Sequence, residues 1–162
     1  MPVFISHRTV DNDLARRVSL RLRVWHGIEC YVDDMDDATQ RLRGTPAITA
    51  LIVRRLNACS NLLAIVTANT VDSWWVPFEV GVARQAPRVI TTFTDQTDDR
   101  LPDFLLEWPR LRGESAVDEF AKLYNAQVRS LTAQVVEKHA MLADQLDAVE
   151  RFHRDLKARL GQ

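Results

Sequence analysis

Short apolar segments alternate with helical patterns up to about residue 94, and this alternation limits the possible folds more than any other feature. The run at residues 62–66, Leu-Leu-Ala-Ile-Val, is apolar at every position and predicts a strand buried on both faces. Residues 3–6, 28–32 and 88–93 predict three more strands. Because the connections between strands and helices are short, we expect an α/β fold with a parallel sheet covered by helices on both faces.

Helical periodicity fills the intervals between these strands. Asp11 or Asn12 is expected to cap a first helix, and Gly27 is a natural stop for it. The apolar residues of that helix, at steps of three and four, are Leu14, Val18, Leu22 and Trp25. A second helix carries Ile48, Ile52 and Leu56. Residues 101–109 predict a short helical turn and a fifth strand, which Pro109 restricts to the edge of the sheet.

The chain from about residue 128 onward is a separate feature. Residues suited to a seam recur there at steps of three and four: Val128, Leu131, Val135, His139, Leu142, Leu146, Val149, His153, Leu156 and Leu160. Such a stripe fits a coiled-coil-like association, and it equally fits a helix that packs on its own domain. We therefore predict one domain over residues 1–125 and a helical tail over residues 126–162. The two histidines are expected to be polar residues at the edge of the seam.

Composition excludes several classes of protein. A chain of 162 residues suits one domain with a sizeable core, and a formal net charge of -1 favours neither nucleic acid nor an anionic membrane. There is no apolar run of membrane-spanning length and no signal-peptide pattern, so a cytoplasmic protein is expected. Cys30 and Cys59 lack the spacing of a disulfide framework or a metal site, and we expect both to be buried packing residues.

The segment at residues 67–79 carries the strongest functional signal. Trp75 and Glu79 are four residues apart, so on a helix they lie on the same face. The segment directly follows the buried strand at residues 62–66. Open α/β sheets bind ligands outside the carboxyl ends of their strands, so an indole beside a carboxylate at this place predicts a site.

The start of this helix is also marked in the sequence. Ser73 or Asp72 is expected to cap it, and Pro77 falls in or just after its first turn, where a missing N–H group costs least. Trp74 lies about 100° around the helix from Trp75, and we expect it to serve stability instead of binding.

Four fragments, in order and at sensible spacing, resemble the TIR (Toll/interleukin-1 receptor) domain family. They are the first-box segment at residues 4–8, the second strand and its aspartate at residues 27–34, the exit of the following loop at residues 44–48, and the Ser-x-Trp-x-x-x-Glu box at residues 73–79. The resemblance covers about residues 2–123 and leaves the tail outside it.

This resemblance implies a five-stranded, flavodoxin-like parallel sheet and a choice of functions. Many bacterial and plant TIR domains, and the animal enzyme of axon degeneration, cleave NAD⁺ at the nicotinamide–ribose bond, whereas many animal TIR domains are non-catalytic adaptors. The glutamate of the box, here Glu79, decides between the two. We expect an NAD⁺ glycohydrolase or cyclase that yields nicotinamide and ADP-ribose or a cyclic isomer, in bacterial antiviral defence. The alternatives are an adaptor module and a secreted effector that mimics host TIR domains.

The expected chemistry needs one carboxylate and no resident cofactor. Cleavage of the glycosidic bond builds an oxocarbenium-like charge on the ribose, which Glu79 would stabilise. Trp75 would form an apolar wall, with cation–π attraction to the pyridinium. No Gly-x-Gly-x-x-Gly turn follows the first strand, so NAD⁺ would be a consumed substrate. No metal is expected either, since the chain has no His/Cys metal cluster.

The same resemblance implies further substrate-binding residues. Arg8 would bind the pyrophosphate, although a surface ion pair with Asp11 or Asp33 is an alternative. Asp33 would bind ribose hydroxyls or cap the loop that follows it. Ser6 and His7 would line the floor of the site. The expected partners are other TIR domains, through self-association, and a separate effector that responds to the product.

Overall fold

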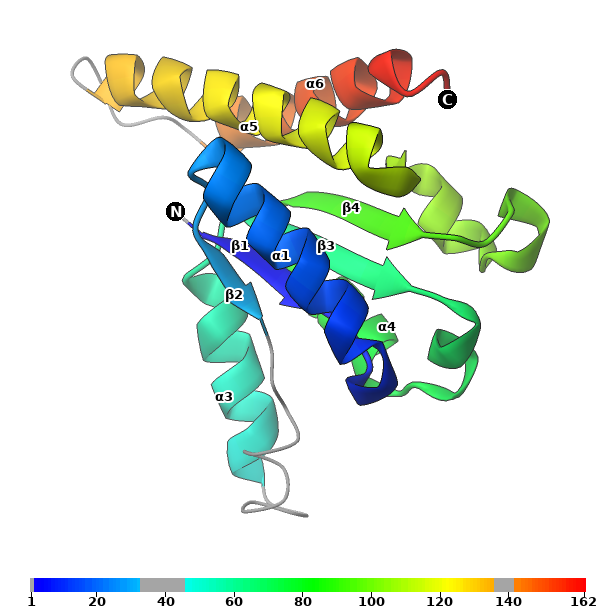
Figure 1. Ribbon diagram of the computed structural model, residues 1–162. Helices are drawn as coiled ribbons and strands as arrows, with labels where there is room; N and C mark the ends of the chain where they lie inside the picture. Colours follow the sequence, from blue (N-terminus) through cyan, green and yellow to red (C-terminus); the bar gives the residue numbers. More distant parts are fainter. Residues whose placement is uncertain (1, 33–45, 136–141) are drawn as a thin grey trace.

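The computed structural model describes residues 2–32, 46–135 and 142–162 (Figure 1). Five parallel strands form one sheet in the order β2-β1-β3-β4-β5. The strands are β1 (Val3–Ser6), β2 (Cys30–Val32), β3 (Asn61–Val66), β4 (Val89–Thr94) and β5 (Arg110–Leu111). The expected parallel α/β sheet is confirmed. Its fifth strand lies just beyond the predicted range of residues 101–109, because that range contains the short turn η4 and the strand begins directly after Pro109.

Helices cover both faces of this sheet (Figure 1). The α-helices of the described residues are α1 (Asn12–His26), α3 (Pro46–Asn57), α4 (Trp75–Arg84), α5 (Gly113–Val135) and α6 (Leu142–Arg159). Short 3₁₀ turns are η1 (Thr9–Asp11), η2 (Ala68–Asp72), η3 (Asp98–Arg100) and η4 (Asp103–Glu107). Helices α1, α5 and α6 pack on one face, and α3 and α4 pack on the other.

The strand pleat divides the core into two clusters. Ile5 and Leu63 point toward α1 and α5, whereas Phe4 and Leu62 point toward α3 and α4. All six residues of β3 are buried. A strand that is enclosed on both sides needs apolar side chains in both directions, which explains the uninterrupted apolar run at residues 62–66.

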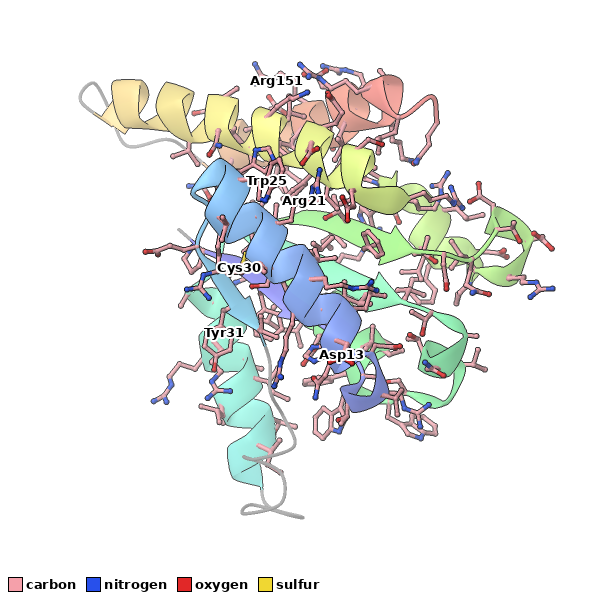
Figure 2. The ribbon with its side chains drawn as sticks, in the orientation of Figure 1. Asp13, Arg21, Trp25, Cys30, Tyr31 and Arg151 are labelled. Atoms are coloured by element: carbon pink, nitrogen blue, oxygen red, sulfur yellow. The ribbon has the colours of Figure 1, made fainter. Side chains whose placement is uncertain are left out.

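Helix α1 follows the predicted pattern except at its last turn. Gly27 ends the helix in the left-handed conformation, with φ of 65°. Leu22 is fully buried, but Trp25 is 72% exposed and contradicts the prediction that it lies on the buried face. The Arg21 guanidinium lies 5.1 Å from the centre of its ring (Figure 2). Trp25 sits at the border of the apolar face and packs against a side chain one turn earlier instead of against the sheet.

The C-terminal stripe packs on the domain in its second half. Phe152 and Leu156 of α6 are buried in the cluster formed by α1 and α5, and Leu146 is 47% exposed. Helix α5 runs without a break across the predicted boundary at residues 125 and 126. His139 lies outside the described residues. Packing on the domain is thus the arrangement that α6 shows.

Helix α6 also supplies hydrogen-bonding partners to the open edge of the sheet. The N–H of Ile90, in β4, donates to Nε2 of His153 at 3.0 Å. Beyond α6, the Gln162 side chain accepts from the N–H of Arg110 at 3.0 Å and donates to its carbonyl at 2.6 Å. Since β5 has two residues and pairs with residues 92–93 of β4, His153 satisfies a backbone group of β4 that β5 does not reach, and Gln162 satisfies the backbone of β5 itself.

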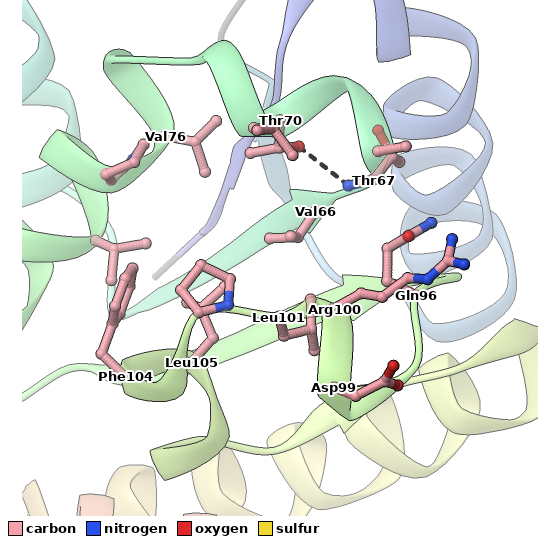
Figure 3. Close-up of a pocket in the computed structure, with 15 residues that line it drawn as sticks. Val66, Thr67, Thr70, Val76, Gln96, Asp99, Arg100, Leu101, Phe104 and Leu105 are labelled. Atoms are coloured by element: carbon pink, nitrogen blue, oxygen red, sulfur yellow. Dashed lines mark hydrogen bonds between the residues drawn. The ribbon is translucent and has the colours of Figure 1, made fainter.

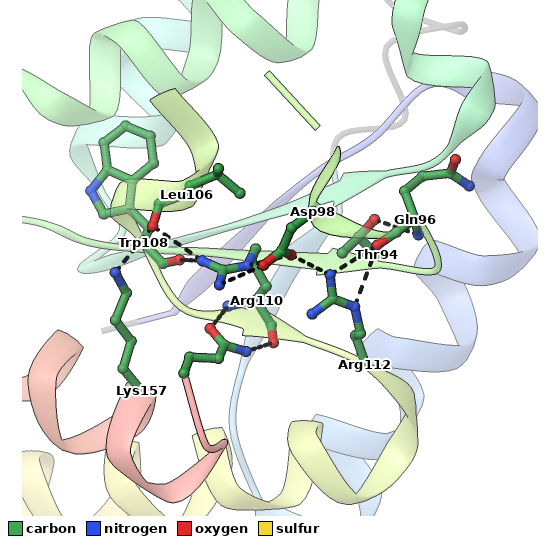
Figure 4. Close-up of polar contacts among 9 residues, drawn as sticks. Thr94, Gln96, Asp98, Leu106, Trp108, Arg110, Arg112 and Lys157 are labelled. Carbon is green, nitrogen blue, oxygen red and sulfur yellow. Dashed lines mark hydrogen bonds and ion pairs between the residues drawn. The ribbon is translucent and has the colours of Figure 1, made fainter. Parts of the chain in front are cut away.

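Charged side chains fix the chain around β5 (Figure 4). Asp98, just after β4, pairs with Arg110 at 3.0 Å and with Arg112 at 2.6 Å. Lys157 of α6 donates to the carbonyl of Leu106 at 3.1 Å. Helix α6 is therefore bound to the edge of the domain by polar contacts as well as by apolar packing.

The burial of His153 makes the docking of α6 sensitive to acid. Burial, reinforced by Lys157, lowers the pKa of His153 to about 4, although Glu107 acts in the opposite direction. Protonation would remove the acceptor of the Ile90 N–H. The stabilisation is therefore complete above pH 6.5 and is lost as the pH falls toward 4, by at most about 3 kcal/mol of unfolding free energy.

We predict that wild type loses more stability than His153→Gln between pH 6.5 and 4. Glutamine retains an acceptor for the N–H but does not titrate. The measurement is the melting temperature of both proteins across this range, with near-equal values expected above pH 7. Parallel acid profiles would contradict this role of His153.

Candidate active site

The candidate site lies at the carboxyl edge of the sheet, where the direction of strand addition changes. Strand β1 lies between β2 and β3, and the chain enters β2 on one side of it before it returns to β3 on the other. Ser6, His7 and Arg8 follow or end β1, while η2 and α4 follow β3. Such a change of direction is where open parallel sheets bind ligands.

Helix α4 begins as the sequence predicts. The hydroxyl of Ser73 accepts a hydrogen bond from the N–H of Val76 at 3.3 Å, and Pro77 occupies the first turn. The side chain of Asp72, the alternative cap, lies outside the described residues. Trp74 is 89% exposed, which contradicts the expectation that it stabilises the fold. It directly precedes α4, whose first residue is Trp75.

Glu79 and Trp75 differ in their access to solvent. Glu79 is 2% exposed, so it is not a solvated charge on the helix surface. Trp75 is 37% exposed, and its ring meets Phe78 edge-on with the centroids 5.9 Å apart. The helix thus presents an accessible indole one turn before a buried carboxylate.

Two buried polar atoms at the end of β1 have no hydrogen-bond partner among the described residues. One is the hydroxyl of Ser6, which lies on the same face of β1 as Phe4 and hence on the α4 side of the sheet. The other is Nδ1 of His7, whose Nε2 contacts the side-chain oxygen of Asn12. Buried polar atoms are normally satisfied, so a ligand with donors and acceptors would complete this edge.

Arg8 is held by the loop after β3. Its guanidinium donates to the carbonyl of Asn69 in η2. Arg8 does not form the ion pair with Asp11 that was the expected alternative. Asp33 lies outside the described residues, so its predicted role stays a prediction.

Asp11 has a role that the sequence analysis missed. Its carboxylate is buried and accepts from the Thr67 hydroxyl at 2.9 Å and from the Asn69 side-chain amide at 2.8 Å. It makes no side-chain cap for α1. The Thr67 and Thr70 side chains form a capping box at the start of η2, a local pattern that is visible in the sequence. Asp11 therefore joins the turn after β1 to the turn after β3.

The thiols have the character of packing groups. Cys59 is buried and Cys30 is half-buried, and neither forms a disulfide. Burial raises the pKa of the Cys30 thiol to about 11 and also raises that of Cys59, so both stay protonated at neutral pH. Within the described residues, no group of three His, Cys, Asp or Glu side chains could hold a metal ion.

Comparison with protein families agrees with this arrangement. A family model described as TIR domain matches residues 3–131. The chain belongs to the TIR domain family. No curated protein matches it. In this TIR domain the matched region contains the whole sheet and most of α5, and α6 lies beyond it. Over the residues that the structure describes, no helix has the length and apolar character needed to cross a membrane.

We predict that Asp11→Ala lowers the free energy of unfolding by about 1–2 kcal/mol, because the buried Thr67 hydroxyl loses its acceptor and the exposed Asn69 amide loses a hydrogen bond. Asp13→Ala, at an exposed position in the first turn of α1, is the matched control and should change stability little. Urea denaturation measures both. Equal effects of the two substitutions would show that the bonds of Asp11 do not stabilise the fold.

Proposed function

We propose that this TIR domain cleaves the nicotinamide–ribose bond of NAD⁺, with Glu79 as the catalytic residue. The observation that carries the proposal is the position of Glu79, buried on α4 at the ligand-binding edge of the sheet, in a chain of this family. The products would be nicotinamide and ADP-ribose or a cyclic isomer of ADP-ribose.

The proposed chemistry uses Glu79 as an electrostatic group. The bond between C1′ of the ribose and the pyridinium nitrogen breaks, and its electron pair leaves with neutral nicotinamide. Positive charge then develops on the ribose, and a nearby carboxylate stabilises it. Water, or a nucleophile of the same ADP-ribose, attacks the cation. No proton donor is needed for the leaving group, so one carboxylate suffices.

The surrounding residues have matching roles in this proposal. Trp75 would provide a wall for the nicotinamide. Arg8, already oriented by the carbonyl of Asn69, would face the pyrophosphate. The unpartnered atoms of Ser6 and His7 would bind polar groups of the substrate. Asp33 would contribute to ribose binding from the end of β2.

Access to Glu79 adds a condition to the proposal. A side chain that is 2% exposed has to be uncovered before it meets a sugar. Self-association is common among TIR domains, and we propose that contact with a second copy helps to open or complete the site. Activity would then rise with protein concentration. We place the enzyme in the cytoplasm, in bacterial antiviral signalling, where its product would act on a separate effector.

An adaptor function is the second candidate, and one observation favours it. Val71 and Trp74, at the turn before α4, are 83% and 89% exposed. Large exposed apolar side chains of this kind mark contact surfaces between proteins. An adaptor would use this surface and leave Glu79 without a catalytic role.

We predict that Glu79→Gln keeps the fold and lowers NAD⁺ cleavage at least about a hundredfold, since loss of one preorganised electrostatic group costs about a hundred- to a thousandfold. The measurement is nicotinamide release, followed by chromatography at several protein concentrations. Glu150→Gln, exposed on α6, is the control and should retain full activity. Equal activity of wild type and Glu79→Gln would remove Glu79 from the mechanism, and inactivity of the wild type at every concentration would favour the adaptor.

We also predict that Trp75→Ala raises KM and lowers kcat together, because a wall that binds and orients the substrate affects both constants. Trp25→Ala, at an exposed tryptophan on α1, serves as the control, and little change in kcat is expected. Steady-state kinetics of both variants at one protein concentration make the comparison. Similar losses of kcat would mean that Trp75 has no special place in the site.

A further inference from the structure

A cavity of about 360 Å³ lies beside α4 (Figure 3). It opens between η2 and α4 on one side and the segment from η3 to η4 on the other. Val76 and Val80 line it, whereas Trp75 and Glu79 do not. Because Val76 is three residues before Glu79, the two lie on neighbouring parts of the helix surface, and the cavity therefore adjoins the candidate active site.

Most residues that line this cavity are apolar. Besides Val76 and Val80, most of the wall is formed by apolar residues: Val66, Leu101, Pro102, Phe104 and Leu105. The two wall threonines have already used their hydroxyl hydrogens, because Thr67 donates to Asp11 and Thr70 donates to the carbonyl of Ile65. An occupant would therefore meet methyl groups and rings over most of its surface.

Charge is found at the rim of the cavity. Arg100, in η3, is exposed, and its guanidinium has no hydrogen-bond or ion-pair partner among the described residues. It points to the same end of the cavity as Gln96, and the carboxylate of Asp99 points away from it (Figure 3). The Gln96 amide donates to Asp95, so the Arg100 guanidinium is the group at this end that is available to bind an anion.

We propose that this cavity binds a small molecule with an apolar, ring-containing body and an anionic end group. Its volume falls within the range of about 300–1,000 Å³ that is typical of small-molecule sites, which are mostly apolar with a few polar groups that set orientation. The ring system would fill the space beside Val76 and Val80. The anion would pair with Arg100, and the occupant would cover Phe104, which is 45% exposed.

The test compares two fluorescent probes that differ in charge. The first, 1-anilinonaphthalene-8-sulfonate, carries a sulfonate, and the second, N-phenyl-1-naphthylamine, has the same rings without it. The full chain is titrated with each probe as wild type, as Ala68→Phe and as Arg100→Gln. Ala68 is exposed and lines the cavity, so a phenylalanine there blocks the space without entering the buried core. Circular dichroism and melting temperature establish that each variant is folded.

We expect saturable binding of both probes to wild type and at least tenfold weaker binding of both to Ala68→Phe. Arg100→Gln should weaken the sulfonate probe about threefold, as expected for an exposed ion pair, and leave the neutral probe unchanged. Arg17→Gln, an exposed arginine on α1, is the control and should change neither. Equal binding to wild type and a folded Ala68→Phe, or no saturable binding at all, would overturn the site. Equal effects of Arg100→Gln on both probes would overturn the anionic end group.

Discussion

The backbone of β3 is enclosed on every side, and much of the architecture follows from that constraint. Strand β3 pairs with β1 along one edge and with β4 along the other. Its side chains pack against helices on both faces of the sheet. Parallel strands need crossover helices, which cover the faces and leave the ends of the strands open. One set of polar groups gathers at the carboxyl ends of the strands, where η2 and the turn after β1 meet. The Asp11 carboxylate holds these two turns together by accepting from Thr67 and Asn69.

The strands and most helices could be predicted because their signals are local. Apolar runs identify β1 and β3, and a run of β-branched and aromatic residues identifies β4. Gly27 ends α1 through a conformation that glycine adopts readily. Periodicity shows that a helix has an apolar face but does not identify the element that packs against that face. The docking of α6 depends on the contact between His153 and Ile90, which are 63 positions apart, and on a fifth strand of two residues. Trp25 was placed wrongly for the same reason, since a border position packs inward or outward according to its neighbours.

In the candidate site, too, the features with a local sequence signal could be predicted and those that join distant residues could not. The spacing of Trp75 and Glu79, the cap at Ser73 and the place of the box after a buried strand are properties of one short segment, so the sequence revealed them. Asp11 bonds to Thr67 and Asn69, which follow it by 56 and 58 positions. No local pattern distinguishes such a carboxylate from an ordinary helix cap. The exposure of Trp74 depends on the residue at which α4 begins. Assignments at helix ends are uncertain by a residue or two, which is enough to turn a side chain away from the core.

Burial of Glu79 bears on its proposed electrostatic role and on its access to substrate. A carboxylate shielded from water acts on a developing cation with little screening, which would be the advantage of a buried group in the proposed reaction. The same shielding would keep the ribose away until the cover shifts. Val76 and Val80, which hold α4 against the domain, also form one wall of the cavity beside Arg100. Wall atoms that face a cavity make fewer dispersion contacts than atoms in a continuous core, so α4 is packed less tightly along Val76 and Val80. A shift of α4 is therefore one way in which the proposed catalytic group would become accessible.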